Sequence, residues 1–198
     1  MSENYIDIML DVETLGVGNS PVLLQIAAIP FDIETGETFA GFNQFINPKS
    51  CIKSGLEIDS GTVKFWLNED LEAIQKVLIA AIESEDSLDI VLSMFSIFVE
   101  RVENFHKKKV RVWGNGVLAD NKWIESAYIK LGKKLPWKYN ANSDVRTLVD
   151  LGKRLLDIDP KNTIEFTGTK HDAIDDCLHQ IKYCSEIYKK LGKIGELK

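Results

Sequence analysis

The chain has 198 residues, of which 44% are hydrophobic and 27% are charged, and its formal net charge is -6. This length suits a single globular domain, residues 1–198, with a sizeable core. No apolar run approaches the ~20 residues that cross a bilayer, and the first residues lack the basic region and cleavage site of a secretory signal. We therefore expect a cytoplasmic protein with no membrane partner. Three cysteines without Cys-x-x-Cys spacing argue against a disulfide framework and against structural zinc.

The first predicted element is a β-strand that ends in two carboxylates. Hydrophobic residues occupy every second position from Ile6 to Val12, and this period of two indicates a strand. Asp11 and Glu13 then share one side of it, roughly 6.8 Å apart at ~3.4 Å per residue. Such close carboxylates repel each other unless a cation lies between them, and oxygen ligands favour Mg2+ or Mn2+. Two solvated acids at the end of a surface strand are the alternative.

Further strands are expected along the chain. Residues 22–31 are apolar and rich in branched side chains, and residues 37–46 alternate aromatic and polar positions. Their short links predict an antiparallel meander with the first strand. Residues 110–113 predict a fourth strand, and the connection that follows the next helix is a candidate for a fifth near residues 137–139.

Apolar residues at helical spacing predict the other elements. Ser60 or Thr62 is expected to cap a short helix that ends at Trp66, and Asn68 a longer one that starts near Glu69. Later helices are expected over residues 88–102, 118–131, 144–156 and 172–191, with a loop over 157–170. Strands followed by alternating helices and strands predict an α/β fold, a mixed sheet flanked by helices.

The charge is unevenly distributed along the chain. Residues 1–100 carry 17 acidic and 4 basic groups, whereas residues 101–154 carry 13 basic and 5 acidic groups. A basic middle segment can meet phosphate even in an acidic protein. Solvated lysines in surface loops are an equally good explanation.

Three acidic sites stand where strand ends and helix starts can converge. Asp11 and Glu13 end the first strand, Asp120 follows the fourth, and the segment His171-Asp-Ala-Ile-Asp-Asp176 opens the last helix. If that helix begins directly after His171, Asp176 lies one turn in and His171 lies at its entrance. This placement lets Asp176 hold a metal while His171 reaches over it.

These motifs resemble the DEDDh branch of the RNase H-like 3′-to-5′ exonucleases. The matching segments, in the order of that family, are Asp11-Val-Glu13-Thr14, Asn115-Gly-Val-Leu-Ala-Asp120 and His171-Asp-Ala-Ile-Asp-Asp176. Other segments are most similar to compact phage enzymes of the exodeoxyribonuclease A type and to a related bacterial exoribonuclease type. Ala27 and Ala119 depart from the usual Gly and Phe, but neither change removes a metal ligand.

The resemblance implies a fold, cofactors and a reaction. The fold is an RNase H-like mixed five-stranded sheet, an antiparallel meander followed by parallel strands. Two divalent cations, Mg2+ with Mn2+ as a substitute, would be held by Asp11, Glu13, Asp120 and Asp176. His171 would be the general base, since an imidazole accepts a water proton near neutral pH. Asp172 and Asp175 compete with Asp176 for the ligand role.

Substrate contacts are expected beside these ligands. The residues predicted to contact the terminal nucleotide are Thr14, Leu15, Gly16, Trp66 and Asn115. Phe65 and Trp66 can stack on bases or belong to the core, and Asn115 can position substrate or shape its turn. Arg146 can reach phosphate or form an ion pair on the helix surface.

The resulting prediction is a metal-dependent exonuclease that releases nucleoside monophosphates from single-stranded nucleic acid with a free 3′ end, DNA being favoured. Its alternatives are a 3′-to-5′ exoribonuclease, a proofreading partner of a polymerase, a related nuclease that cuts internally and a binding module without activity. The expected location is the cytoplasm, which is the host cytoplasm if a phage encodes the protein. The sequence leaves the native metal and the oligomeric state open.

Overall fold

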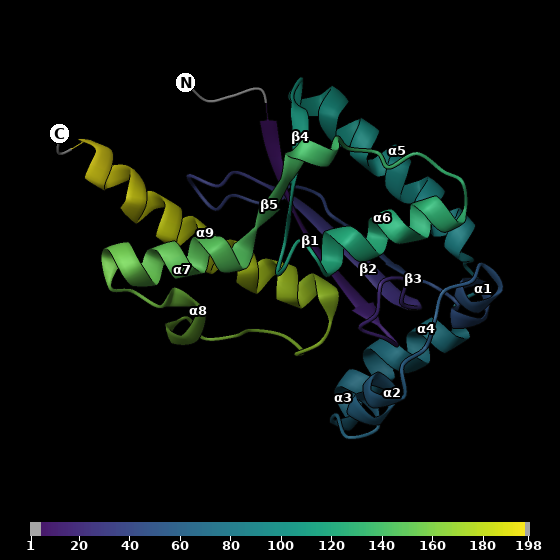
Figure 1. The fold of residues 1–198 in the computed structure, drawn as a ribbon. Coiled ribbons are helices and arrows are strands. Elements are labelled where there is room, and N and C mark those ends of the chain that lie inside the picture. Colours follow the sequence, from purple (N-terminus) through teal and green to yellow (C-terminus); the bar gives the residue numbers. More distant parts are fainter. Residues whose placement is uncertain (1–4, 197–198) are drawn as a thin grey trace.

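The computed structural model describes residues 5–196, and a five-stranded mixed sheet in the order β3-β2-β1-β4-β5 lies at its centre (Figure 1). The strands are β1 (Tyr5–Thr14), β2 (Leu23–Phe31), β3 (Phe42–Phe45), β4 (Lys109–Gly114) and β5 (Asn142–Asp144). β1, β2 and β3 pair antiparallel, whereas β4 is parallel to β1 and β5 is parallel to β4. The predicted meander followed by parallel strands is confirmed.

β1 is the middle strand, and both of its faces are buried. The side chains of Ile6, Ile8, Leu10 and Val12 belong to the core on one face, and Met9 belongs to the core on the other. All nine residues of β2 beside it are buried as well. A strand with neighbours on both sides and helices on both faces gains its stability from apolar burial, which explains why hydrophobic residues predominate in β1 and β2.

Helices cover the two faces of the sheet. The major ones are α5 (Leu88–His106), α6 (Asp120–Lys130), α7 (Val145–Leu156) and α9 (Ala173–Glu196). α5 and α6 pack on one face, and α7 and α9 pack on the other (Figure 1). The shorter helical elements are α1 (Pro48–Lys53), η2 (Tyr139–Ala141) and α8 (Pro160–Thr163). Of the described helices, none has the length and apolar character needed to cross a membrane.

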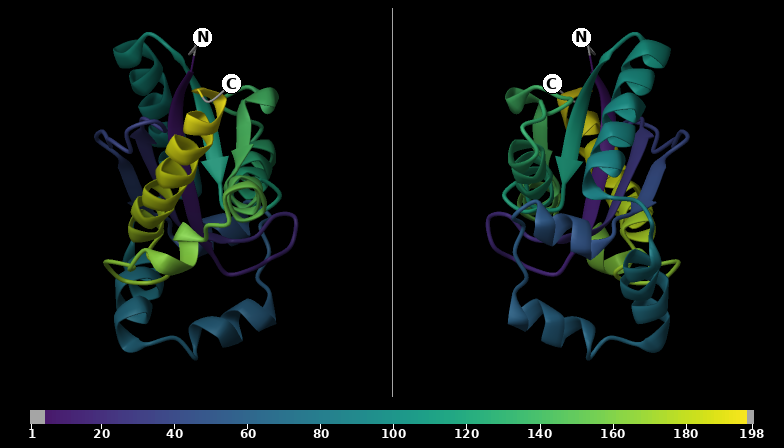
Figure 2. Two further views of the ribbon diagram at one scale, coloured as in Figure 1. Left: turned by 90° about the vertical axis from the view of Figure 1, so that its left-hand side faces the viewer. Right: turned by 90° about the vertical axis from the view of Figure 1, so that its right-hand side faces the viewer.

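Residues 59–83, which we call the arch, pass beneath the C-terminal end of β1 (Figure 2). The arch contains α2 (Ser60–Trp66), α3 (Leu71–Ala73), the π-helix η1 (Ile74–Ile79) and α4 (Ala80–Glu83). Its helix starts differ from the prediction, because Asp59 accepts a hydrogen bond from the Thr62 amide and Asp70 accepts one from the Ala73 amide. Asp59 and Asp70 are therefore the N-caps. Ser60, Thr62 and Asn68 were the wrong candidates.

The sheet edges also differ from the prediction. β3 begins at Phe42. In the predicted strand segment before it, residues 37–41, Thr38 alone among the described residues pairs with β2, through an isolated bridge to Phe31. The fifth strand lies at residues 142–144 instead of 137–139. Trp137 is buried there, and its indole nitrogen donates to Asn142 Oδ1 at 2.9 Å. Its apolar ring packs in the core and does not form a strand of its own.

Other expectations are confirmed. Asp144 caps α7 by accepting from the Thr147 amide at 2.8 Å, and α7 ends at Leu156 as predicted. The three cysteines are free and buried.

Two features of the C-terminal region differ from the prediction. The last helix begins at Ala173, one residue later than expected, and α8 interrupts the predicted loop over residues 157–170.

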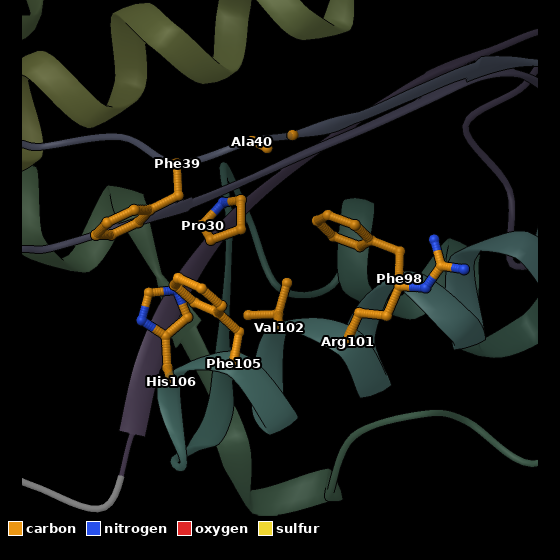
Figure 3. A pocket seen from close by; sticks show the side chains of 9 residues that line it. Pro30, Phe39, Ala40, Phe98, Arg101, Val102, Phe105 and His106 are labelled. Atoms are coloured by element: carbon orange, nitrogen blue, oxygen red, sulfur yellow. The ribbon is translucent and has the colours of Figure 1, made fainter.

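An aromatic pocket of about 410 Å³ lies between the β2–β3 side of the sheet and α5 (Figure 3). Pro30 on its wall pairs in register with Ile8, so this pocket is near the first half of β1. Its wall consists of Pro30, Phe39, Ala40, Gly41, Phe98, Arg101, Val102, Phe105 and His106. In the part of the chain that the structure describes, no carboxylate lines this pocket, so it lacks the ligands that a hard cation needs.

Candidate active site

The predicted ligands meet at the C-terminal end of β1. They line a cleft of about 290 Å³, which we call the acid cleft. Its lining residues are Asp11, Val12, Glu13, Asn115, Ala119, Asp120, Trp123, Arg146, His171, Asp176 and Gln180. Asp11 and Glu13 come from β1, Asp120 begins α6 directly after the β4 turn, and Asp176 lies in the first turn of α9. Three segments distant in sequence thus bring four carboxylates and His171 together.

Burial and mutual repulsion dominate the electrostatics of the acid cleft. Burial, followed by the charges of Asp120, Glu13 and Asp176, holds the pKa of Asp11 well above its usual value. Burial and then Asp176 and Asp120 do the same to the pKa of Glu13. Burial raises the pKa of Asp120 to about 7 and also raises the pKa of Asp176. Without a counter-charge, these carboxylates are therefore unfavourable in their ionised form.

This set of donors fits divalent cations. Atoms of Glu13, His171 and Asp176 that can each act as a ligand lie within 4.8 Å of one another. Asp11 and Asp120 add carboxylate oxygens to the wall of the same cleft. Mg2+ and Mn2+ prefer oxygen ligands, and their positive charge offsets the repulsion between the acids.

His171 lies on the turn that enters α9 and keeps its ring accessible. Its backbone has φ +63°, a left-handed conformation that is uncommon outside glycine. Its amide donates to Asp176 Oδ2 at 3.2 Å, and 39% of its side chain is exposed. Phe65 meets the imidazole edge to face at 5.1 Å, and Glu69 Oε2 lies 3.8 Å from His171 Nε2. The imidazole is thus placed beside Asp176 while it remains open to solvent.

The competing acids at the start of α9 have other partners. Asp172 is buried, accepts from Gln25 Nε2 at 2.7 Å and pairs with Lys76 Nζ at 2.7 Å. Asp175 pairs with the same ammonium at 2.9 Å and accepts from the Thr169 amide at 2.8 Å. These bonds fasten α9 to β2 and to the arch. Of the three aspartates, only Asp176 lines the acid cleft.

A family model described as the Rv2179c-like 3′-5′ exoribonuclease domain matches residues 6–188. The chain belongs to this family. It is therefore a 3′-to-5′ exonuclease, a hydrolase of phosphodiester bonds. In the comparison with curated proteins, nothing matches.

Solved structures share the fold of this Rv2179c-like domain. The nuclease domain of 3′hExo, a DEDDh family member bound to rAMP, is 14% identical with a TM-score of 0.65, and the match covers 93% of this chain and 92% of that one. A 3′-exonuclease described with 3′-end recognition of a histone mRNA stem-loop is 13% identical with a TM-score of 0.63, covering 96% and 84%. Exonuclease I of E. coli in complex with a dT13 oligonucleotide is 16% identical with a TM-score of 0.63, covering 98% and 43%. The sheet and its helices therefore have the RNase H-like DEDDh arrangement.

In this Rv2179c-like domain, the residues after Glu13 contribute mainly to the shape of the strand end. Thr14, Leu15 and Gly16 are buried, and Thr14 Oγ1 donates to the Gly16 carbonyl at 2.7 Å. An adjoining pocket of about 450 Å³ opens beside them, and its wall includes Thr14 but not Leu15 or Gly16. This adjoining pocket is lined by Val12, Glu13, Thr14, Val17, Asp59, Gly61, Thr62, Phe65, Trp66 and Trp123.

Base stacking by Trp66 is not supported by its position. Its side chain is 1% exposed, and its indole nitrogen donates to the Thr14 carbonyl at 2.9 Å. Stacking needs an open ring face, which a buried indole does not offer. Phe65 beside it is 42% exposed and lines the same adjoining pocket. The exposed aromatic ring of the pair is thus Phe65.

The turn after β4 is fixed by the start of α7. Asp144 Oδ2 accepts from the Val117 amide at 2.9 Å while its Oδ1 caps the helix. Asn115, at the beginning of this turn, lines the acid cleft. Sequence reasoning missed Gln180, whose amide donates to Asp11 Oδ1 at 2.7 Å, and also missed Glu69. Neither residue belongs to a motif, but Gln180 is one helical turn after Asp176, which places both on one face of α9.

Proposed function

We propose that the protein removes nucleoside 5′-monophosphates one at a time from the 3′ end of single-stranded RNA. The supporting observation is the convergence of four carboxylates and His171 in one cleft. RNA is chosen because the matching family is described as exoribonuclease. The sequence itself favoured DNA, but no contact in the site supports that preference.

The four carboxylates are proposed to hold two divalent cations, Mg2+ with Mn2+ as a substitute. When bound, such cations supply positive charge to the attacking and the leaving oxygens of a phosphodiester displacement. Asp11 and Glu13 are presented by a buried strand, so their positions are fixed before substrate arrives. Gln180 holds one oxygen of Asp11 at 2.7 Å and prevents that carboxylate from turning away. The protein thus supplies a preorganised, partly dry acid cleft.

His171 is proposed to accept the proton of the attacking water. His171 lines the acid cleft and 39% of its side chain is exposed, so its imidazole can meet a water there. Glu69 Oε2 on the arch lies 3.8 Å from His171 Nε2. The movement of one proton from water to imidazole leaves the oxygen free to attack phosphorus.

The adjoining pocket is proposed to receive the terminal nucleoside. It shares Val12, Glu13 and Trp123 with the acid cleft, so a phosphate at the carboxylates places its 3′ nucleoside next to Phe65. Thr14 lines this pocket directly. Leu15 and Gly16 do not line it, but their carbonyls accept hydrogen bonds from two residues that do, Asp59 at 2.8 Å and Thr14 at 2.7 Å. Stacking on Phe65 tolerates any base, as removal of successive nucleotides requires.

The test uses RNA and DNA oligomers of the same sequence, labelled at the 5′ end, with Mg2+, with Mn2+ and with a chelator. We expect a ladder that shortens from the 3′ end, nucleoside 5′-monophosphate as product, faster cleavage of RNA and no cleavage with chelator. A circular single strand should resist, and Asp11→Asn is the control for contaminating nuclease. Cleavage of the circle or persistence of activity with chelator would contradict the proposal, and faster cleavage of DNA would contradict its RNA assignment.

A further inference from the structure

Arg146 differs from the other charged residues of the acid cleft. It lies in the first turn of α7 and is exposed, and among the described residues it is the only arginine or lysine on the cleft wall. It belongs to the basic segment of residues 101–154. Other cations of that segment, Lys109 and Lys133, pair with carboxylates. Within residues 5–196, no carboxylate lies at ion-pair distance from Arg146. Its positive charge acts on Asp120 and Asp144 without a direct ion pair, so the hydrogen-bond donors of the guanidinium can still bind an anion.

The backbone around Arg146 holds the guanidinium in place. Gly116 has φ +119°, and a Cβ at this position would lie 3.2 Å from Arg146 Cζ. The guanidinium therefore packs against the turn after β4, where a larger residue would push it away. Asp144 fixes both partners, because it caps α7 and accepts from the Val117 amide. An exposed arginine with this support loses less rotamer freedom when it binds an anion.

The position of Arg146 indicates which part of the substrate it meets. The adjoining pocket shares Val12, Glu13 and Trp123 with the acid cleft, but Arg146 does not line it. Arg146 is therefore not at the terminal nucleoside. The part of the substrate on the 5′ side of the scissile linkage must pass along the cleft wall outside the adjoining pocket, and Arg146 belongs to that wall. Phosphate oxygens are the anionic groups of that part of the chain, and a guanidinium binds them with two parallel hydrogen bonds.

We propose that Arg146 is a substrate-binding residue for the phosphate immediately 5′ of the scissile linkage. This inference rests on the proposed function. The contact distinguishes a chain from the product, because a nucleoside 5′-monophosphate carries only the phosphate that was cleaved. Arg146 therefore strengthens binding of oligonucleotides and leaves the release of the mononucleotide unhindered.

The test combines Arg146→Gln with an oligomer that carries one uncharged methylphosphonate at the linkage 5′ of the scissile one. Removal of the first nucleotide is measured as kcat/KM on this oligomer and on the all-phosphate oligomer. Loss of a hydrogen bond to a charged group corresponds to a decrease in kcat/KM of roughly 10- to 100-fold. We expect wild type to lose this factor on the methylphosphonate, and Arg146→Gln to lose it on the normal oligomer with no further loss on the modified one. In Arg146→Gln, the slope of the logarithm of the binding constant against the logarithm of the salt concentration should also become shallower by about 0.7.

Controls separate this inference from the proposed function. Arg154→Gln removes another α7 arginine, which pairs with Asp150 on the exposed surface, and should behave as wild type. Inhibition by nucleoside 5′-monophosphate should be the same in Arg146→Gln and wild type. Equal methylphosphonate losses in both enzymes, or weaker monophosphate inhibition in Arg146→Gln, would overturn the assignment of Arg146. An inactive wild type would instead overturn the proposed function.

Discussion

The two halves of β1 each carry a buried aspartate, and the two residues have opposite surroundings. Asp7 is 7% exposed and Asp11 is 9% exposed, and a spacing of four along a strand puts them on the same face. Asp7 accepts a hydrogen bond from the Trp113 indole at 2.7 Å. Asp11 accepts one from Gln180 but also faces Glu13, Asp120 and Asp176.

This difference shows that burial of a carboxylate does not identify a functional site by itself. A buried acid with a good donor contributes to the fold, whereas several acids in one buried cleft oppose it until a cation arrives. Two pockets of the molecule differ in the same respect. Among the described residues, no carboxylate lines the aromatic pocket (Figure 3), whereas four line the acid cleft.

The largest effect is expected from Asp11→Asn. Loss of one carboxylate from the proposed ligand set should abolish hydrolysis, because the proposed reaction depends on bound cations. The same change should raise the thermal stability of the metal-free protein, since it removes one of four repelling acids. Oligonucleotide cleavage and a melting curve with chelator measure the two effects. A fall in stability together with retained activity would mean that Asp11 resembles Asp7.

The pH dependence of stability sharpens this first prediction. The pKa of Asp120 is about 7 in the folded protein against a usual value of 3.8. Between these values the folded state keeps a proton that the unfolded state has lost. The free energy of unfolding of the metal-free protein should therefore fall as pH rises from about 4 to about 7. Melting temperatures with chelator across this range test it. Asp120→Asn should flatten the slope, and saturating Mg2+ should stabilise most at the higher pH.

His171→Ala should reduce kcat by ~10² to 10⁴-fold, the usual contribution of a general base. The four carboxylates remain in this variant, so Mg2+ should still raise its melting temperature. His179, which lies within α9 and does not line the acid cleft, provides the matched control His179→Ala. If His171→Ala loses the stabilisation by Mg2+ and keeps its turnover at saturating metal, His171 is a ligand and not the base.

Trp66 and Phe65 are neighbours whose replacement should have different effects. Trp66→Ala empties a core position and removes the donor to the Thr14 carbonyl, which should cost about 3 to 5 kcal/mol of stability. Phe65→Ala should leave stability nearly unchanged and weaken substrate binding roughly tenfold, since stacking contributes ~1 to 3 kcal/mol per base. Urea unfolding and KM measurements separate the two. A KM increase for Trp66→Ala at full stability would restore the sequence-based prediction.

The sequence predicted correctly those features of the fold and the site that depend on a local pattern of residues. The alternation of β1 predicts which side Asp11 and Glu13 share, and the first turn of a helix predicts that Asp176 lies near His171. Asp144 was recognised as a cap because an aspartate directly precedes a helical pattern. These features need only a few neighbouring residues, and the structure confirms them.

The sequence was less informative where tertiary packing decides. Nothing local distinguishes Trp66 from Phe65, yet the fold buries one and exposes the other. Nothing in the sequence distinguishes Lys76 from other lysines. In the fold it forms ion pairs with Asp172 and Asp175, which follow it by almost a hundred residues in the chain. This partner on the arch holds Asp172 and Asp175 outside the acid cleft, and no local pattern predicts it.

The smallest effect is expected from Asp7→Ala, which tests the other half of β1. The change leaves the buried Trp113 indole without its carboxylate partner, and a lost buried hydrogen bond of this kind costs ~1 to 3 kcal/mol. Because Asp7 lies outside the acid cleft, kcat, KM and the stabilisation by Mg2+ should stay at wild-type values. Urea unfolding with and without Mg2+, followed by cleavage assays, measures all of them. A variant that keeps its stability but loses activity would show that the two halves of β1 are coupled, and the division between a structural and a functional aspartate would no longer hold.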